Sequence, residues 1–510
     1  MKDLIKQLLR QRNLDRASVE RLKLEWAEKH NAKIPLNSQI LAAATPREIA
    51  KLKKFLITKP TRTLSGVATV ALMTKPAGCP GKCTYCPTSA DVPKSYTGFE
   101  PSTMRARRNE FDSYKIVKNR LKQLKSVGHS TDKCEVIIQG GTFTWLSWSY
   151  QKNFVKRAYD AFNGKDSKNL EQAKKLNEKA QHRVVSLIIE TRPDFCSEKH
   201  IKQLLELGAT RVELGLQSVY DTILKKVKRG HDLQTCKDAI RNLKNTGFKV
   251  DLHIMIGLPG STKASDIKMF KILFSDEDLR PDGLKIYPCA VIQGSQLYKD
   301  WKAGKYKPIS DKYIIDVLSE VKAKYIPTYV RIKRIMRDIP SNYIEAGYTY
   351  PNLREFIHKK MAEKGLECRC IRCREIGHRF WKHGAKPGKI QLIVTRYGAS
   401  EGEEFFISAE DVKNDILIGF ARLRIAEGKA FLRELHVYGQ EIPLDNPGKN
   451  IFITAQHKGF GKKLLETAEQ IAKHHKMKEI LVLAGAGVKE YYRKLGYRDQ
   501  GYYVAKNLFQ

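Results

Sequence analysis

Apolar runs alternate with segments of helical periodicity over the first 290 residues or so of the chain. Between the runs, apolar residues recur every three to four positions, which is the period of a helix. Strands that are apolar on both faces and alternate with helices predict a parallel sheet of βα units. Six units predict an α/β fold with a partial (β/α)6 barrel, whose chemistry lies at the C-terminal strand ends. The six runs span residues 66–74, 134–141, 184–191, 211–218, 249–257 and 283–289.

A different pattern occupies the last 120 residues or so. Four successive strand-like runs come first, and a helix, a strand, a short helix and a last strand follow them. This order predicts a separate α+β domain with a mainly antiparallel sheet. The patterns divide the chain into four expected parts, namely a basic helical arm at 1–60, the barrel domain at 61–330, a basic linker at 331–389 and the α+β domain at 390–510.

The net charge is unusually positive. The chain of 510 residues carries 93 Lys and Arg against 55 Asp and Glu, a formal charge of +38, and 42% of its residues are hydrophobic. That hydrophobic content excludes a mostly disordered chain. The charge favours nucleic acid as a partner, while a Lys-rich solubilising surface and an anionic membrane stay open as alternatives.

The apolar runs are short. Residues 1–13 lack the apolar core of a secretory signal, and runs such as 67–73 fall well below the roughly 20 residues of a membrane-spanning helix. We therefore expect a cytoplasmic protein with no membrane partner. In a reducing compartment, tight clusters of cysteines indicate metal ligands rather than disulfides.

The first cysteine cluster follows directly after the first predicted strand. Cys79, Cys83 and Cys86 form the pattern Cys-x3-Cys-x2-Cys. Three thiolates hold three irons of a [4Fe–4S] cluster and leave the fourth iron for the amino and carboxylate groups of S-adenosylmethionine (SAM). A structural zinc site is the alternative, and no fourth Cys or His nearby completes it.

This motif at the first strand of a βα barrel resembles the radical SAM superfamily. Gln139-Gly140-Gly141-Thr142, at the end of the second strand, resembles the Gly-Gly-Glu motif of that superfamily, with Thr in place of Glu. Glu190 and Gln217 end the third and fourth strands. The resemblance implies that Gly140, Gly141, Glu190 and Gln217 contact SAM.

The C-terminal domain carries a second resemblance. Residues 456–461 form a glycine-containing turn that opens an amphipathic helix, a geometry that suits a pyrophosphate and that an ordinary helix start shares. With the strand at 432–437 and the segment at 491–497, the turn resembles the GNAT acetyltransferases, which bind acetyl-CoA. That resemblance implies that either Tyr491 or Tyr492 lies near the thioester sulfur, and it favours Tyr492.

One chain with both modules resembles the family of the catalytic subunit of Elongator, including its single-chain archaeal and bacterial relatives. Segments 95–105, 128–133, 337–340 and 433–439 carry this resemblance. It implies attachment of a carboxymethyl-type group to carbon 5 of the wobble uridine in tRNA. The excess of basic residues in the arm at 1–60 predicts that this arm contacts the tRNA phosphates. The acetyl-CoA contacts that it implies are Lys133, Glu434, Leu435, His436, Val437, Phe460, Gly461, Lys462 and Tyr492.

The corresponding hypothesis is a radical acyl transfer. A SAM-derived radical removes hydrogen from the acetyl methyl group of acetyl-CoA, and the acetyl carbon radical adds to uridine carbon 5. Hydrolysis of the thioester then releases CoA and leaves a carboxymethyl group. The hypothesis requires an electron donor and leaves a homodimer or accessory subunits open. The alternatives are a protein lysine acetyltransferase with a structural Fe–S cluster and a non-catalytic RNA-binding scaffold.

The linker holds a second cysteine cluster. Cys368, Cys370 and Cys373 place three soft ligands within six residues, which favours zinc. His378, Cys289 or His358 are the candidates for a fourth ligand, and a second Fe–S cluster or free thiols are the alternatives.

A run of alternating basic and apolar residues opens the linker. Residues 329–337 predict a strand that buries one face and directs Arg331, Lys333 and Arg337 outward. With Arg334, these residues are predicted to bind RNA phosphates, and a solvated face is the alternative.

Overall fold

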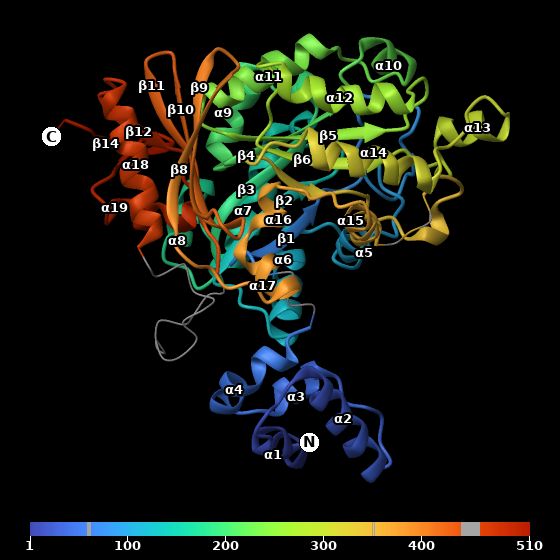
Figure 1. Ribbon diagram of the computed structural model, residues 1–510, viewed down its shortest axis with the longest axis vertical. Helices are drawn as coiled ribbons and strands as arrows, with labels where there is room; N and C mark the ends of the chain where they lie inside the picture. Colours follow the sequence, from blue (N-terminus) through green and yellow to red (C-terminus); the bar gives the residue numbers. More distant parts are fainter. Residues whose placement is uncertain (59–62, 349, 351, 440–458, 510) are drawn as a thin grey trace.

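The computed structural model (Figure 1) describes residues 1–58, 63–348, 350, 352–439 and 459–509. An N-terminal helical unit lies below the rest of the molecule in this view and contains α1 Lys2–Arg10, α2 Arg16–Lys29, α3 Asn37–Ala43 and α4 Pro46–Leu56. Its own small core includes Leu4, Leu22 and Leu56. A capping box fixes the start of α4, because Thr45 and Glu48 each accept a hydrogen bond from the backbone N–H of the other.

The central element is a seven-stranded parallel sheet in which every strand pairs with its neighbours in sequence. The sheet is open, since its first and last strands do not pair with each other. The predicted parallel βα sheet is confirmed, and the structure adds a seventh strand from the basic run of the linker. The strands are β1 Ala68–Met73, β2 Lys133–Gln139, β3 Arg183–Thr191, β4 Arg211–Gln217, β5 Lys249–Ile256, β6 Gly283–Pro288 and β7 Arg331–Arg334.

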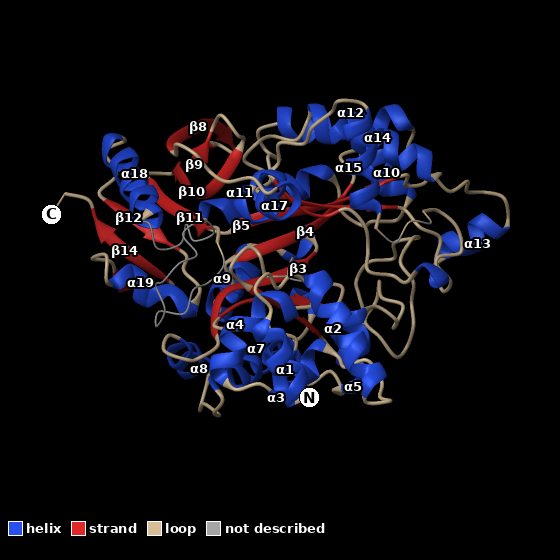
Figure 2. Ribbon diagram, turned by 60° about the horizontal axis from the view of Figure 1, so that its bottom comes forward, coloured by secondary structure: helices blue, strands red, loops and turns tan. Residues whose placement is uncertain are grey.

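Helices cover the outer face of this sheet (Figure 2). Apolar strand residues such as Val70, Val136 and Val212 pack against them and are fully buried or nearly so. The helices of this part of the chain are α5 Pro101–Arg108, α6 Ser113–Ser126, α7 Trp148–Asn163, α8 Leu170–Asn177, α9 Glu198–Leu207, α10 Asp221–Lys226, α11 Leu233–Asn245, α12 Lys263–Ser275, α13 Gln296–Lys302 and α14 Asp311–Lys324, of which α13 projects away from the sheet (Figure 1). None of the helices that the structure describes has the length and apolarity to cross a membrane.

The second sheet confirms the predicted α+β domain. Its strand order is β13-β14-β12-β11-β10-β9-β8. Only β11 and β12 pair in parallel, over Ala430–Leu432 and Ile480–Val482, and they separate beyond that point. The elements are β8 Gln391–Ala399, β9 Gly402–Asp411, β10 Ile416–Ala426, β11 Lys429–Val437, α18 Phe460–His474, β12 Glu479–Val482, α19 Lys489–Arg493, β13 Arg498–Gln500 and β14 Tyr503–Asn507.

Short helices complete the structure and connect the two sheets. The linker forms α15 Leu353–Glu363, α16 Ile371–Arg374 and α17 Ile376–His383. The 3-10 helices are η2 Phe143–Trp145, η3 Pro193–Phe195, η4 Ser341–Tyr343 and η5 Ala486–Val488. The turn before η5 lies directly against β3, where a Cβ on Gly485 would meet the Val185 carbonyl oxygen at 2.3 Å.

Buried ion pairs fix the two sheets to each other. Arg433 of β11 contacts Asp282, which directly precedes β6, at 2.6 Å, and Glu404 of β9 at 2.7 Å. Arg211 of β4 contacts Glu434 at 2.6 Å. Removing one partner of such a buried pair costs about 3–5 kcal/mol, because the other charge is left unpaired. The two sheets are therefore held in one fixed arrangement.

Candidate active site

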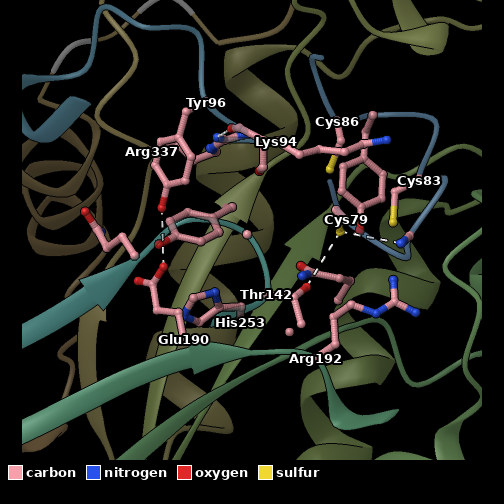
Figure 3. Close-up of a pocket in the computed structure, with 18 of the residues that line it drawn as sticks. Cys79, Cys83, Cys86, Lys94, Tyr96, Thr142, Glu190, Arg192, His253 and Arg337 are labelled. Atoms are coloured by element: carbon pink, nitrogen blue, oxygen red, sulfur yellow. Dashed lines mark hydrogen bonds between the residues drawn. The ribbon is translucent and has the colours of Figure 1, made fainter. Parts of the chain in front are cut away.

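A cavity of about 130 Å³, here called the cysteine cavity, lies at the C-terminal ends of the parallel strands (Figure 3). The loop after β1 brings Cys79, Cys83 and Cys86 to its wall. Gly141, Glu190 and Gln217 line the same cavity from the ends of β2, β3 and β4. The strand ends therefore bring together residues that are more than 130 positions apart in the sequence.

The three sulfurs lie around the cavity rather than at one point. They do not form one of the side-chain groups of the described residues whose ligand atoms all lie within 4.8 Å of one another. This spread suits a multi-iron cluster better than a single ion. The hydrogen bond from Cys86 and the charge of Arg229 lower the pKa of Cys83, whereas the same hydrogen bond raises the pKa of Cys86, so the thiolate of this pair is on Cys83. The Arg229 Nη1 atom is 3.5 Å from the Cys83 sulfur.

Unsatisfied polar atoms around this cavity suit a polar ligand. Gln139 Oε1, Gln217 Oε1 and Arg192 Nη1 are buried, and they have no hydrogen-bond partner among the described residues. Such atoms are costly unless a ligand or water satisfies them. A Cβ on Gly140, which adopts φ +140°, would meet Thr74 Oγ1 at 2.0 Å, so this turn requires glycine. The donor set and the unsatisfied atoms fit SAM beside an Fe–S cluster.

Thr142 and the predicted SAM contact Glu190 both have protein partners. Thr142 Oγ1, in the position of the expected Glu, is 3.6 Å from the Cys79 sulfur. Glu190 accepts hydrogen bonds from Lys285 Nζ at 2.7 Å and from the Tyr96 hydroxyl at 3.3 Å. Glu190 therefore helps to hold Lys285 and Tyr96 in the wall of the site.

Glu190, Glu213 and His253 form a compact group whose ligand atoms lie within 4.8 Å of one another. The Lys285 ammonium contacts both carboxylates and is itself 4% exposed. Lys285 therefore supplies the cation that this acidic group needs.

The sequence interpretation missed two arginines that line the cysteine cavity. Arg229 donates to the Gly215 carbonyl oxygen and to Cys83, and Arg192 forms an ion pair with Asp194 at 2.8 Å. Arg192 directly follows a strand end, which is a signal that the sequence offered. Arg229 comes from the loop after α10, and only the fold brings it to the cysteines.

A second cavity of about 420 Å³, the strand-gap cavity, lies where β11 and β12 separate. The predicted residues of β11, namely Glu434, Leu435, His436 and Val437, line it together with Gly461, Tyr491 and Tyr492. Lys133 of β2 lines the opposite wall, so both sheets contribute to this cavity. The gap between two diverging strands beside a helix N-terminus suits the extended, anionic acetyl-CoA molecule.

The two tyrosines differ in accessibility. Tyr491 is 41% exposed, and a Cβ on Gly461 would lie 3.0 Å from its hydroxyl, whereas Tyr492 is 6% exposed and packs edge-on against Tyr497.

Phe460 and Lys462 share the first turn of α18 but do not line the cavity. Lys462 forms an ion pair with Glu466 at 3.6 Å. The predicted pyrophosphate turn at 456–458 lies outside the described residues.

The basic run forms β7, but the outward direction expected for its side chains is wrong. Arg331 contacts Glu375 at 2.5 Å, and Lys333 contacts Asp251 at 2.8 Å and Glu213 at 3.2 Å. These carboxylates lie on the inner side of the open parallel sheet, here called the half-barrel, or at its edge. Their negative charges attract the basic side chains inward. The Arg334 side chain, 40% exposed, pairs with Asp338 at 2.5 Å, and Arg337 donates to the Ser95 carbonyl oxygen.

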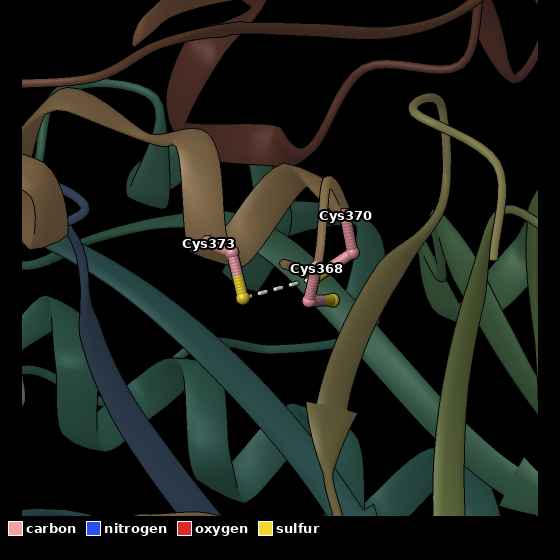
Figure 4. A group of neighbouring side chains, drawn as sticks. All are labelled: Cys368, Cys370 and Cys373. Atoms are coloured by element: carbon pink, nitrogen blue, oxygen red, sulfur yellow. Dashed lines mark hydrogen bonds between the residues drawn. The ribbon is translucent and has the colours of Figure 1, made fainter. Parts of the chain in front are cut away.

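The second cysteine group is compact (Figure 4). The sulfurs of Cys368, Cys370 and Cys373 all lie within 4.8 Å of one another. Of the three candidates for a fourth ligand, His358 is near, with Nε2 at 3.8 Å from the Cys373 sulfur. His378 contacts Glu375 at 3.1 Å, and Cys289 packs in the separate apolar cluster that contains Cys83. The Lys322 ammonium lies 3.2 Å from the Cys368 sulfur.

Family models match most of the chain. The Radical SAM superfamily matches residues 73–272, and the Radical_SAM C-terminal domain matches 281–363. The ELP3 N-terminal domain matches 1–64, and the Acetyltransferase (GNAT) family matches 374–497.

Individual relatives match over nearly their full length. The tRNA uridine(34) acetyltransferase of Methanocaldococcus jannaschii is 49% identical over 98% of this chain and 95% of its own. Elongator complex protein 3 of Homo sapiens is 38% identical over 99% of this chain and 96% of its own. The solved structure of the archaeal Methanocaldococcus infernus Elp3 with an N-terminal deletion superposes with a TM-score of 0.78 at 46% identity, and it covers 87% of this chain and 100% of its own. The chain therefore belongs to the family of the tRNA uridine(34) acetyltransferases and Elongator complex protein 3, in which a radical SAM domain and a GNAT domain share one polypeptide.

Proposed function

We propose that this protein modifies the wobble uridine of tRNA by attaching a carboxymethyl-type group, derived from acetyl-CoA, to carbon 5. The observation that carries the proposal is the placement of two cavities along β2. Lys133, at the start of this strand, lines the strand-gap cavity, and Gln139, at its end, lines the cysteine cavity. One rigid strand thus links a site suited to radical chemistry with a site suited to an acyl donor.

In the cysteine cavity, Cys79, Cys83 and Cys86 would hold a [4Fe–4S] cluster. With SAM bound, this cluster supplies the one-electron cleavage that yields a 5′-deoxyadenosyl radical when an external donor reduces it. Gly140 and Gly141 allow the ligand to approach the backbone closely, and Gln217 offers its unpaired oxygen. Glu190 acts through the Lys285 and Tyr96 side chains that it holds.

In the strand-gap cavity, the β11 residues Glu434, Leu435, His436 and Val437 and the cavity residues Lys133 and Gly461 would contact acetyl-CoA. Phe460 and Lys462 would contribute to the same helix start, and Tyr492 or Tyr491 would lie near the thioester. Burial alone would raise the pKa of Glu434, but the charges of Arg211 and Arg422 hold that pKa well below its usual range. A lysine acetyltransferase needs a base whose pKa lies near neutrality, so Glu434 is unsuited to that alternative.

The RNA would bind through basic residues of the helical arm and of the cysteine-cavity rim. Arg334 and Arg337 line the cysteine cavity, whereas Arg331 and Lys333 lie deeper and are paired with carboxylates. Phosphate contacts position the RNA without reading its sequence.

A zinc ion would be bound by Cys368, Cys370 and Cys373, with His358 as the fourth ligand. This ion would stabilise the linker between the two sheets.

The test is an anaerobic reconstitution with iron and sulfide, followed by addition of tRNA, SAM, a reductant and acetyl-CoA deuterated at the methyl group. We expect a carboxymethyl-type uridine in the tRNA nucleosides and deuterium in the 5′-deoxyadenosine, both by mass spectrometry. Unlabelled 5′-deoxyadenosine alongside modified tRNA would contradict hydrogen abstraction from the acetyl group. Acetylated protein with unmodified tRNA would favour the lysine acetyltransferase instead.

A further inference from the structure

Three cavities follow one another along the inner face of the parallel sheet. Between the strand-gap cavity and the cysteine cavity lies a third one of about 530 Å³, here called the barrel cavity. Glu135 of β2 lines both the strand-gap and the barrel cavity, Ile137 lines the barrel cavity, and Gln139 lines both the barrel and the cysteine cavity. These are alternate residues, so they share one face of the strand. At about 3.3 Å per residue, the row from Lys133 to Gln139 spans about 20 Å.

On the opposite walls, too, neighbouring cavities share lining residues. Arg211 of β4 and His436 of β11 line both the strand-gap and the barrel cavity. Arg334 and Asp338, at and just after the end of β7, line both the barrel and the cysteine cavity. Neighbouring cavities thus share wall residues on several different elements.

The interior of this half-barrel is not packed with apolar side chains. Closed βα barrels fill their interior with layers of branched apolar residues. Here Thr69 is exposed and Ala71 is half-buried, although Ala68, Val70 and Leu72 of the same strand are buried. The barrel cavity is lined by the charged residues Glu135, Arg211, Lys285 and Lys333, among others. Polar, accessible positions therefore lie on the face of the sheet where a packed core would be expected.

The proposed function requires acetyl-CoA and SAM to react, although the two cavities proposed to bind them are separated by the barrel cavity. Reacting atoms must approach to about 3–3.5 Å, whereas the strand-gap and cysteine cavities lie at opposite ends of β2. We propose that the barrel cavity is an internal passage that receives the acyl-thioester end of acetyl-CoA and delivers it to the cysteine cavity. The inference rests on the proposed function. Lys285 and Lys333, which are paired with Glu190, Glu213 and Asp251, line this route and keep it polar.

The first test uses one substitution that should narrow the passage and a second, opposite it, that should widen it again. Ala71 and Ile137 are register partners on β1 and β2, and both line the barrel cavity alone. We expect Ala71→Phe to reduce tRNA product and deuterium transfer into 5′-deoxyadenosine at least 10-fold. Acetyl-CoA binding, measured by calorimetry, should stay within about 2-fold of wild type. Adding Ile137→Ala to Ala71→Phe should restore at least half of the lost activity, and Ala71→Ser serves as the size-matched control.

Unchanged product formation in folded Ala71→Phe would overturn the passage, and so would a loss that Ile137→Ala does not relieve. Failure of the wild-type protein to form any product would instead contradict the proposed function, which separates the two results.

The second test needs neither the cluster nor turnover. The full chain with Ala71→Cys is treated with chloroacetyl-CoA, whose acyl end alkylates thiols, and the modified positions are mapped by peptide mass spectrometry. The matched control is Ala17→Cys on the exposed face of α2. We expect alkylation at position 71 to be at least 10-fold faster than at position 17 and to be blocked by excess acetyl-CoA. Equal rates at the two positions, or no protection by acetyl-CoA, would overturn the passage.

Discussion

The two cysteine groups of this chain contain the same ligand type but occupy opposite environments. The sulfurs of Cys79, Cys83 and Cys86 are spread around a cavity with unsatisfied buried polar atoms. The sulfurs of Cys368, Cys370 and Cys373 all lie within 4.8 Å of one another, beside α16 in the linker. An open set with unsatisfied neighbours suits a centre that binds a further ligand, whereas a compact set suits a single ion that stabilises the fold.

A cation lies beside each group and extends the comparison. Arg229 is 3.5 Å from the Cys83 sulfur, and Lys322 is 3.2 Å from the Cys368 sulfur. If the first group is reactive and the second structural, removing the two cations should affect different properties. The comparison therefore yields predictions that separate activity from stability.

The largest expected effect is that of Cys83→Ala. We expect loss of iron and a fall of more than 100-fold in 5′-deoxyadenosine formation, because one of three cluster ligands is removed. The matched control is Cys236→Ala, which removes a fully buried thiol that packs in the core. It should keep activity within about 2-fold at a stability cost of about 1 kcal/mol. Normal SAM cleavage by Cys83→Ala would contradict a catalytic role for the first group.

A smaller effect is expected for Arg229→Gln. Loss of the positive charge beside Cys83 should make the cluster harder to reduce, because the reduced state carries more negative charge. We expect a more negative midpoint potential by electron paramagnetic resonance titration and SAM cleavage slowed about 10-fold, or about 1.4 kcal/mol in barrier. Arg229→Lys keeps the charge and should recover most of the potential shift. An unchanged potential in Arg229→Gln would show that this cation does not act on the cluster.

Variants of the second group should affect stability more than activity. We expect Cys370→Ser to lose about one zinc per chain by metal analysis and to lower the melting temperature by about 5 °C, because the bound ion stabilises only the folded linker. SAM cleavage should stay within about 3-fold of wild type. Lys322→Met, which removes the neighbouring cation and keeps all three thiols, should leave the zinc content unchanged. Loss of SAM cleavage in Cys370→Ser with an unaltered melting temperature would reverse the roles of the two groups.

Hydrophobic periodicity predicted much of the fold. The apolar runs of the barrel form its strands, because the residues that each strand buries against the helices are close together in the sequence and leave a local signal. The sequence pattern places the strand predicted over 329–337 in the linker, and only its pairing with β6 shows that β7 belongs to the parallel sheet. The direction of its basic side chains was wrong for a related reason. Their partners, Glu213, Asp251 and Glu375, lie on other elements that no local pattern connects with β7.

The candidate site, too, could be predicted only in part from the sequence. The spacing of Cys79, Cys83 and Cys86 identified the first group, and the roles assigned to individual site residues stay predictions. Arg229 could not be recognised, since it is 146 positions from the cysteine that it contacts. The sequence left three candidates for the fourth ligand of the second group, and the structure places His358 Nε2 at 3.8 Å from the Cys373 sulfur.

By itself, the sequence determined the positive charge, which is a sum over all residues, and it determined the two sheet types and the two groups of thiols, because each of these depends on residues that are near one another along the chain. Only the tertiary structure decided that β7 joins the parallel sheet, that the inner face of this sheet is polar and accessible, and that the gap between β11 and β12 faces β2. Those features depend on how side chains from distant strands fill, or fail to fill, a shared space. Packing of that kind is settled only when the whole chain has folded.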